Sequence, residues 1–227
     1  LAPRAIRKGR HVLLEKPLGP TLEDARNIVR AVADNGVAAL CFLTRMFVGE
    51  MSAFVERARA TAPTSGEASF RSNALIEGPY ASSAWRQGEH GALWDAAPHG
   101  MSVLVSVLGP VEEVSASLSP DGSYAIMFRH VAGSRSQLDL NLRDRSVKLA
   151  ERYRFSGTET VELPGLAYDR KATFAHAAGL LLKEIGGERK ESNSRLRLGL
   201  HLVAVAVAAQ ESLRSGGAFI PVASATP

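Results

Sequence analysis

The sequence predicts an α/β unit followed by an α+β unit. Two continuous apolar runs flank an amphipathic helix near the start, and short stretches of alternating apolar and polar residues follow from residue 66 to residue 163. The 227 residues suffice for one large domain or two modest ones, and 45% hydrophobic with 22% charged residues is an ordinary composition for a soluble globular protein.

The first unit is predicted from residues 11–43. Residues 12–14 and 37–43 are uninterrupted apolar runs, which are typical of parallel strands covered on both faces. Between them, Thr21 is a typical N-cap and Gly36 a typical helix stop, with an apolar face from Leu22 to Val32. We therefore expect a buried strand, a helix and a second parallel strand with a right-handed crossover.

The second unit begins with a short helix near residues 51–58. Strands are predicted at residues 66–77, 111–118, 123–130, 137–143, 147–155 and 158–163, and helices at 95–108, 171–185 and 194–214. Closely spaced alternating strands favour a mostly antiparallel sheet with one solvated face, so we expect the helices to cover the other face.

Composition also excludes several classes of protein. The single cysteine, Cys41, allows no internal disulfide and no thiolate zinc site, and it fits a reducing, cytoplasmic location. The net charge is only +4, and the basic stretch 143–154 interleaves Asp144 and Glu151 with apolar residues at strand spacing. We interpret it as a solvated sheet face rather than a nucleic-acid surface. The longest apolar run, LVAVAVAA, is shorter than the ~20 residues that cross a bilayer.

A charged triplet follows the first predicted strand. Glu15, Lys16 and Pro17 lie where an apolar strand should end on turn residues, and Pro17 ends the strand because it lacks an N–H donor. In an open α/β sheet, ligands bind beyond the carboxyl ends of the strands. The triplet is therefore predicted to face a ligand crevice.

A second polar motif opens the helix predicted from residue 95. In GALWDAAPHG, Asp95 and His99 are four residues apart, so both should lie on one face of the first helical turn. By itself the motif also fits Asp95 as an N-cap and His99 as a structural histidine. As metal ligands the pair lacks a third partner, so no metal site is predicted. Structural or solvated roles are the simpler interpretation of the other histidines, which are His11, His90, His130, His176 and His201.

Taken together, these motifs resemble one family. The run from Ile6 through KGRHVLLEKPLGPTLEDARNIVRAVADNGV resembles the Glu-Lys-Pro region of the Gfo/Idh/MocA oxidoreductases, and WRQGEHGALWDAAPHGMSVLVSVLGPVEEVSA resembles their Asp/His motif. The terminal RLGLHLVAVAVAAQESLRSGGAFIPV resembles their closing helix and last strand, so the resemblance spans essentially the whole chain. Ala97 and Ser102 stand where many members have Gly and Asp, which points to an altered polar contact with substrate.

The resemblance implies a two-domain enzyme. Residues 1–46 would be the C-terminal part of a Rossmann domain that binds NAD or NADP, and residues 47–227 would be an α+β domain for substrate binding and homo-oligomerisation through its open sheet face. Carried over by motif, the catalytic residues would be Lys16, Asp95 and His99. The cofactor-binding residues would be Glu15, Lys16, Pro17 and Arg45, and the substrate-binding residues Lys16, Trp85, Arg86, Asp95 and His99.

These residues suit hydride transfer from an alcohol carbon. A histidine with an ordinary pKa of ~6.5 can accept the hydroxyl proton, and an ammonium group can stabilise the developing alkoxide. His99 is predicted to be the base, Lys16 the electrostatic partner, and Asp95 a group that holds the imidazole or a substrate hydroxyl. The predicted substrate is a sugar or cyclitol. The alternative is a non-catalytic binding or regulatory protein that keeps the substrate-domain sheet.

The sequence begins at Leu1, inside a predicted helix, and contains no G-x-G-x-x-G turn. We therefore expect a truncated gene or a sequence fragment whose preceding segment holds the main cofactor site, and an export signal in such a segment could not be seen. The 227 residues alone are expected not to bind a dinucleotide tightly.

Overall fold

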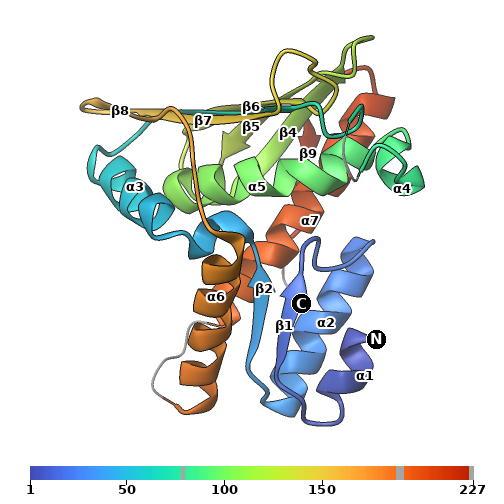
Figure 1. The fold of residues 1–227 in the computed structure, drawn as a ribbon, viewed down its shortest axis with the longest axis vertical. Coiled ribbons are helices and arrows are strands. Elements are labelled where there is room, and N and C mark those ends of the chain that lie inside the picture. Colours follow the sequence, from blue (N-terminus) through green and yellow to red (C-terminus); the bar gives the residue numbers. More distant parts are fainter. Residues whose placement is uncertain (78–79, 188–191, 225–227) are drawn as a thin grey trace.

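The computed structural model describes residues 1–77, 80–187 and 192–224. Figure 1 shows a large sheet with helices beneath it and, below them, two parallel strands enclosed by further helices. In chain order the described elements are α1 (Ala2–Ile6), β1 (Val12–Glu15), α2 (Leu22–Asn35), β2 (Ala39–Phe42), the 3₁₀ helix η1 (Thr44–Phe47), α3 (Gly49–Ala60), β3 (Ser65–Ser72), α4 (Ala84–Gln87), α5 (Gly91–Leu108), β4 (Val111–Leu118), β5 (Tyr124–His130), β6 (Arg135–Asn141), β7 (Leu149–Ser156), β8 (Thr160–Leu163), α6 (Arg170–Ile185), α7 (Ser192–Arg214) and β9 (Ile220–Pro221).

The βαβ unit forms as the sequence predicts. β1 and β2 pair in parallel, and α2 connects them. Thr21 caps α2 by accepting a hydrogen bond from the backbone N–H of Asp24, and Gly36 ends the helix with φ 61°, a left-handed conformation that glycine adopts without a Cβ clash. Local sequence signals were sufficient here because capping involves residues that are neighbours in the chain.

The two strands of this unit differ in burial. All four residues of β2 are buried, whereas Val12, Leu13 and Leu14 of β1 are only half-buried. The sequence predicted a buried first strand, and the structure shows one that is only half-buried. Within the described part of the chain, β1 pairs with β2 alone and has a second edge without a strand.

Helices cover both faces of the small sheet. Cys41 belongs to the main hydrophobic core with residues of α2 and α7, while Leu40 and Phe42 point to the other face, against Ala177 of α6. Although α6 follows β3 to β8 of the large sheet in the chain, Figure 1 shows it beside β2. The chain thus returns to the first unit after β8, and β9 completes the large sheet later.

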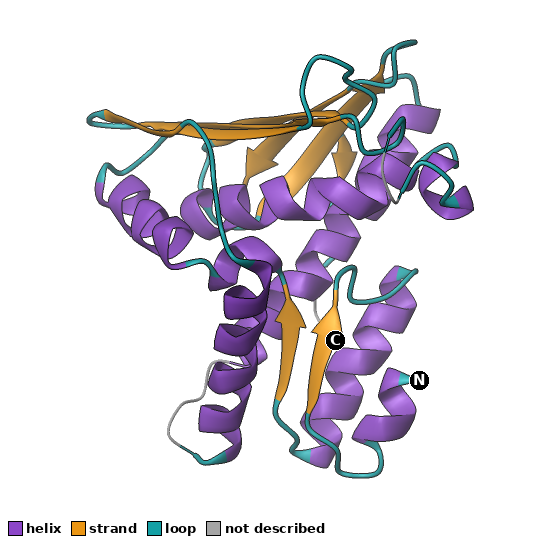
Figure 2. Ribbon diagram, in the orientation of Figure 1, coloured by secondary structure: helices purple, strands orange, loops and turns teal. Residues whose placement is uncertain are grey.

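The large sheet has the strand order β8-β7-β3-β6-β5-β4-β9. β3 and β6 are parallel, and the other neighbouring pairs are antiparallel, which confirms the predicted mostly antiparallel sheet. Buried and exposed residues alternate strictly along β5. Figure 2 shows the helices on one face, and Gly100 of α5 lies so close to the sheet that a Cβ there would meet Leu138 at 2.7 Å.

Two predicted boundaries were wrong. α5 begins at Gly91, one turn before Asp95, so Asp95 is not an N-cap, and Pro98 lies inside the helix. β3 ends at Ser72 rather than near residue 77. For α5, the helical hydrogen bonds begin before the side-chain pattern that was used to place it. For β3, the alternating side-chain pattern continues after the strand pairing ends.

One described helix, α7, is long and apolar enough to cross a membrane by length and composition alone. Most of its apolar segment is buried inside the fold, where it packs against β4, β2 and α2. Its apolar character is therefore explained by its central position in the core.

One histidine joins α7 to the large sheet, and a second lies within that sheet. His201 Nε2 accepts a hydrogen bond from the backbone N–H of Val111 at 3.0 Å, and His130 bridges the Gly109 carbonyl and the Ser136 hydroxyl, at 2.7 Å each. Burial, and then the nearby His130, lower the pKa of His201 from 6.5 to about 4. The folded state therefore disfavours the protonated form of His201.

Acid should destabilise the fold through His201. Because its pKa is about 4 when folded and 6.5 in the reference state, its contribution is complete above pH 6.5 and is lost as pH falls towards 4. Between pH 7.5 and pH 5 the loss should be about 2 kcal/mol in the free energy of unfolding, measured by urea denaturation. His201→Gln, which keeps an acceptor without the titration, should lose markedly less, and the control His11→Gln should behave as wild type. Equal losses in wild type and His201→Gln would contradict this assignment.

Candidate active site

The predicted charged triplet lies where the small sheet meets the helical layer of the large one. In Figure 2 the arrowheads of β1 and β2 point towards α5. Lys16 follows β1, and its Nζ donates to Asp95 Oδ1 at 2.9 Å and also to the Asp95 backbone carbonyl. The Lys16–Pro17 peptide bond is cis. The structure thus brings together two predicted site residues that are 79 positions apart in the chain.

Asp95 is held by two cations. Arg86 Nε donates to Asp95 Oδ2 at 2.8 Å, on the oxygen that Lys16 does not bind, and Arg86 Nη1 donates to Ser83 Oγ at 3.3 Å. Burial favours a raised pKa for the Asp95 carboxyl, but the bonds from Arg86 and Lys16 prevail and hold it below its usual value of 3.8. Asp95 is therefore a carboxylate at neutral pH, with both oxygens engaged.

Arg86 also lies over two aromatic rings. Its guanidinium carbon is 4.3 Å from the ring centroid of Trp85 and 4.3 Å from that of Tyr80. Trp85 is 51% exposed and Tyr80 37%, so both rings present area to solvent beside the Asp95 cluster. Sequence reasoning identified Trp85 and Arg86 but missed Tyr80, which carries no recognisable motif.

His99 lies on the buried side of this cluster. Its imidazole stacks on Phe70 of β3, with centroids 6.0 Å apart and rings inclined by 26°, and its Nδ1 is buried without a hydrogen-bond partner. Burial, and then the positive charges of Arg45 and Lys16, lower the pKa of His99 well below 6.5. The imidazole is therefore neutral at pH 7 and is a proton acceptor.

Arg45 occupies a different environment from the other predicted residues. It is buried and donates through Nε and Nη2 to the two carboxylate oxygens of Glu151, at 3.1 Å each. Tyr153 donates to the same carboxylate at 3.0 Å, and the Arg45 guanidinium carbon lies 5.4 Å from the Phe70 ring and 5.3 Å from the Tyr168 ring. The family resemblance predicts that Arg45 binds the cofactor, but its guanidinium is already paired with Glu151 within the protein.

Glu151 corrects an interpretation of the sequence. It was placed on a solvated sheet face, but it is 4% exposed and points to the covered face of β7. The sequence did indicate this burial, because side chains alternate between the two faces of a strand and Glu151 lies on the same face as Tyr153 and Phe155. A buried carboxylate requires a partner. That partner, Arg45, is 106 residues away in the chain and could not be inferred.

The remaining histidines make structural contacts. His11 accepts from the Ala38 N–H at 2.9 Å, His176 Nδ1 lies 2.9 Å from the Phe47 carbonyl, and His90 is the N-cap residue of α5. Across residues 1–77, 80–187 and 192–224, no group of three or more His, Cys, Asp and Glu side chains is placed to hold a metal ion.

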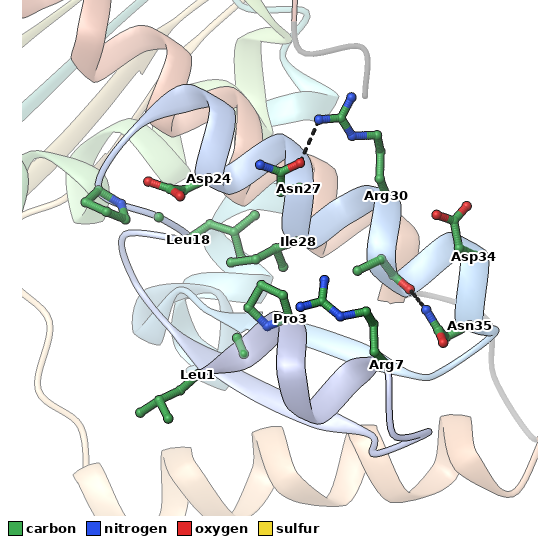
Figure 3. A pocket seen from close by; sticks show the side chains of 14 residues that line it. Leu1, Pro3, Arg7, Leu18, Asp24, Asn27, Ile28, Arg30, Asp34 and Asn35 are labelled. Carbon is green, nitrogen blue, oxygen red and sulfur yellow. Dashed lines mark hydrogen bonds between the residues drawn. The ribbon is translucent and has the colours of Figure 1, made fainter.

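A groove of about 670 Å³ lies away from these residues, between α1, the 18–20 loop and α2. Side chains of both charge signs line it, among them Arg7, Asp24 and Asp34. In Figure 3 the Arg30 guanidinium bonds to Asn27 rather than pointing into free space. Neither Lys16, Asp95 nor His99 lines this groove.

Comparison with known proteins finds a family model that matches the start of the chain. Residues 1–42 match the Gfo/Idh/MocA model, described as an oxidoreductase family with an NAD-binding Rossmann fold. A search of curated protein sequences found no match.

Solved structures share this fold over nearly the whole chain. An oxidoreductase domain protein from Kribbella flavida has a TM-score of 0.82 at 17% identity, covering 98% of this chain and 76% of its own. GenD2 from gentamicin A biosynthesis, in complex with NAD, has a TM-score of 0.81 at 19% identity (98% and 74%). Levoglucosan dehydrogenase, in complex with NADH, has a TM-score of 0.80 at 15% identity (98% and 76%). At these identities the structures establish the common fold.

Replacing Asp95 should destabilise the junction between the two units. Asp95→Asn keeps the side-chain shape but leaves Lys16 and Arg86 without their carboxylate, so the free energy of unfolding should fall by about 2–3 kcal/mol in denaturant titrations at pH 7. The control Glu23→Gln removes the exposed Glu23–Arg30 pair and should change it by less than about 1 kcal/mol. If both substitutions had the same small effect, the Asp95 cluster would not stabilise the junction.

Proposed function

We propose that this protein is an NAD(P)-dependent dehydrogenase of the Gfo/Idh/MocA type that acts on a CH–OH group of a sugar or cyclitol. One observation supports this most directly: Lys16, from the first unit of the fold, bonds to Asp95, which lies one helical turn before the imidazole of His99 on α5. An alcohol oxidation needs this combination of a base and a positive charge near one oxygen.

Each residue has a distinct proposed role. No hydrogen bond among the described residues engages the imidazole of His99, so the ring is available to accept the proton of a substrate hydroxyl. The Lys16 ammonium stabilises negative charge on that oxygen as the proton leaves. Asp95 fixes the position of Lys16 through its 2.9 Å bond, and Arg86 in turn fixes Asp95.

The cofactor supplies the hydride acceptor when it is bound. We propose that Glu15, Lys16 and Pro17, at the carboxyl end of β1, lie beside its nicotinamide end, where open α/β sheets bind their ligands. The unpartnered Nδ1 of His99 fits a site that is completed by another molecule. No glycine-rich G-x-G-x-x-G turn occurs in the sequence, so these residues account for only part of a dinucleotide site.

The substrate class rests on two supports. The exposed rings of Trp85 and Tyr80 beside the Asp95 cluster provide flat apolar area next to charged hydrogen-bonding groups, which suits a polyhydroxylated ring. Levoglucosan dehydrogenase and a protein of gentamicin A biosynthesis share the fold. We further propose that the boundary between the two units follows residue 46, and that the protein is cytoplasmic, which agrees with the free, buried Cys41.

Loss of the base should reduce turnover sharply. With the protein and any segment that precedes Leu1 in its gene, NADH or NADPH absorbance would be followed against a panel of sugars and cyclitols. His99→Ala should lower the rate by ~10²- to 10⁴-fold, the range for a lost general base. The control His90→Ala replaces the histidine just before the same helix, whose side chain makes no capping hydrogen bond, and should change the rate only a few-fold. Turnover of His99→Ala within a few-fold of wild type would refute this role, and saturable polyol binding without hydride transfer would favour the non-catalytic alternative.

We also propose that two copies associate through the uncovered face of the large sheet. The outward residues of β5 are Ala125, Met127 and Arg129, and Met127, in the middle of that strand, is 51% exposed. A second copy is the proposed partner, because the same uncovered face on two chains can form a symmetric interface.

Light scattering should therefore give a mass of at least two chains. Met127→Glu, which places a charge in the face, should shift the population to monomer. The control Val131→Glu adds the same charge at an exposed position just after β5 and should leave the mass unchanged. A wild-type monomer at micromolar concentration would exclude this association.

A further inference from the structure

The buried Arg45–Glu151 pair has no role in the chemistry described above. Both side chains are at most 5% exposed, and the two bonds of 3.1 Å form a bidentate contact. Removing two charges from water is unfavourable, and such pairs add little stability compared with apolar residues of the same size. Stability alone therefore does not explain why this ion pair lies beside the candidate site.

The pair is one ring away from the candidate base. The Phe70 ring contacts the Arg45 guanidinium, 5.4 Å from its centroid, and stacks with the His99 imidazole, 6.0 Å between centroids. Arg45 is in η1, immediately after β2, whereas Glu151 and Phe70 are on neighbouring strands of the large sheet. One guanidinium thus joins the unit that carries Lys16 to the sheet that supports His99.

We infer that Arg45 and Glu151 are positioning residues for His99, and that they fix the Phe70 ring on which the imidazole stacks and set the balance of charge around it. The catalytic consequence rests on the proposed function, in which His99 is the base. The charge balance itself is a property of this chain and needs no cofactor.

The groups around His99 exert a net positive field on it, because the nearby carboxylates are already paired. Two cations act on it, Arg45 from η1 and Lys16 from the end of β1. The nearby anions are both occupied, Asp95 of α5 by Lys16 and Arg86, and Glu151 of β7 by Arg45 and Tyr153. Tyr168, which lies before α6, contacts Arg45 through its ring face. Burial is the main cause that lowers the pKa of His99, and Arg45 and Lys16 add to it. In this inference Glu151, which is bound to Arg45, limits the positive field that Arg45 exerts on the imidazole.

Two substitutions with opposite expected effects test this inference. The His99 ring would be titrated by NMR in the 227-residue chain. Arg45→Met removes a cation, so the pKa of His99 should rise towards 6.5. Glu151→Gln removes the anion that balances Arg45, so the pKa should stay as low as in wild type or fall further. Arg45→Lys keeps the charge and should keep the low pKa.

The outcomes separate positioning from simple structural support. If the pair only held the fold together, both Arg45→Met and Glu151→Gln would loosen the site and raise the pKa of His99, and that result, or no shift in either, would overturn the inference. The matched control is Arg71→Gln. It breaks the exposed Arg71–Asp144 ion pair beside Phe70 on β3 and should leave the pKa of His99 unchanged. Should Arg45→Met not fold, the double variant Arg45→Met/Glu151→Gln leaves no unpaired charge, and its His99 pKa should rise as well.

Activity provides an independent readout. In the active protein, Arg45→Met should shift the pH dependence of kcat in the same direction as the His99 titration and change KM less than kcat. The titration requires neither cofactor nor turnover. A wild-type protein without dehydrogenase activity would therefore refute the proposed function and leave this inference standing. Normal activity, together with a His99 pKa that does not change in the Arg45 and Glu151 variants, would refute this inference and leave the proposed function standing.

Discussion

The ion pair between Lys16 and Asp95 is the contact on which the arrangement of the site depends. Lys16 follows the first strand of a small parallel sheet, and Asp95 lies on the helix that supports the large sheet, so their 2.9 Å bond sets the position of one unit relative to the other at the site. Their side chains are only 12% and 17% exposed, where an unpaired charge would be strongly unfavourable. Arg86 completes the environment by binding the second carboxylate oxygen.

Around this contact the carboxylates are paired, whereas the Nδ1 atom of His99 has no hydrogen-bond partner among the described residues. The Asp95 and Glu151 carboxylates are each held by an arginine, and Asp95 by a lysine as well, while the His99 imidazole stacks on Phe70. Burial, and then the positive charges of Arg45 and Lys16, lower the pKa of His99, so the imidazole is neutral at pH 7.

The family relationship and the local geometry support different conclusions. Solved structures with 15–19% identity have the same fold over 98% of this chain, which shows how little sequence similarity that fold requires. The family model that matches residues 1–42 is described as an oxidoreductase family with an NAD-binding Rossmann fold. The geometry of the site is a separate source of information, because one fold can carry many substrates.

The sequence by itself determined the βαβ unit, the mostly antiparallel sheet and the Lys16 and Asp95/His99 motifs, because caps, apolar periodicity and motif spacing involve residues close together in the chain. Only the tertiary structure decided that α6 covers the small sheet, that α5 begins at Gly91, and that Glu151 is a buried partner of Arg45. Those outcomes depend on contacts between residues as far as 106 positions apart, and local pattern carries no information about which distant side chain will neutralise a buried charge.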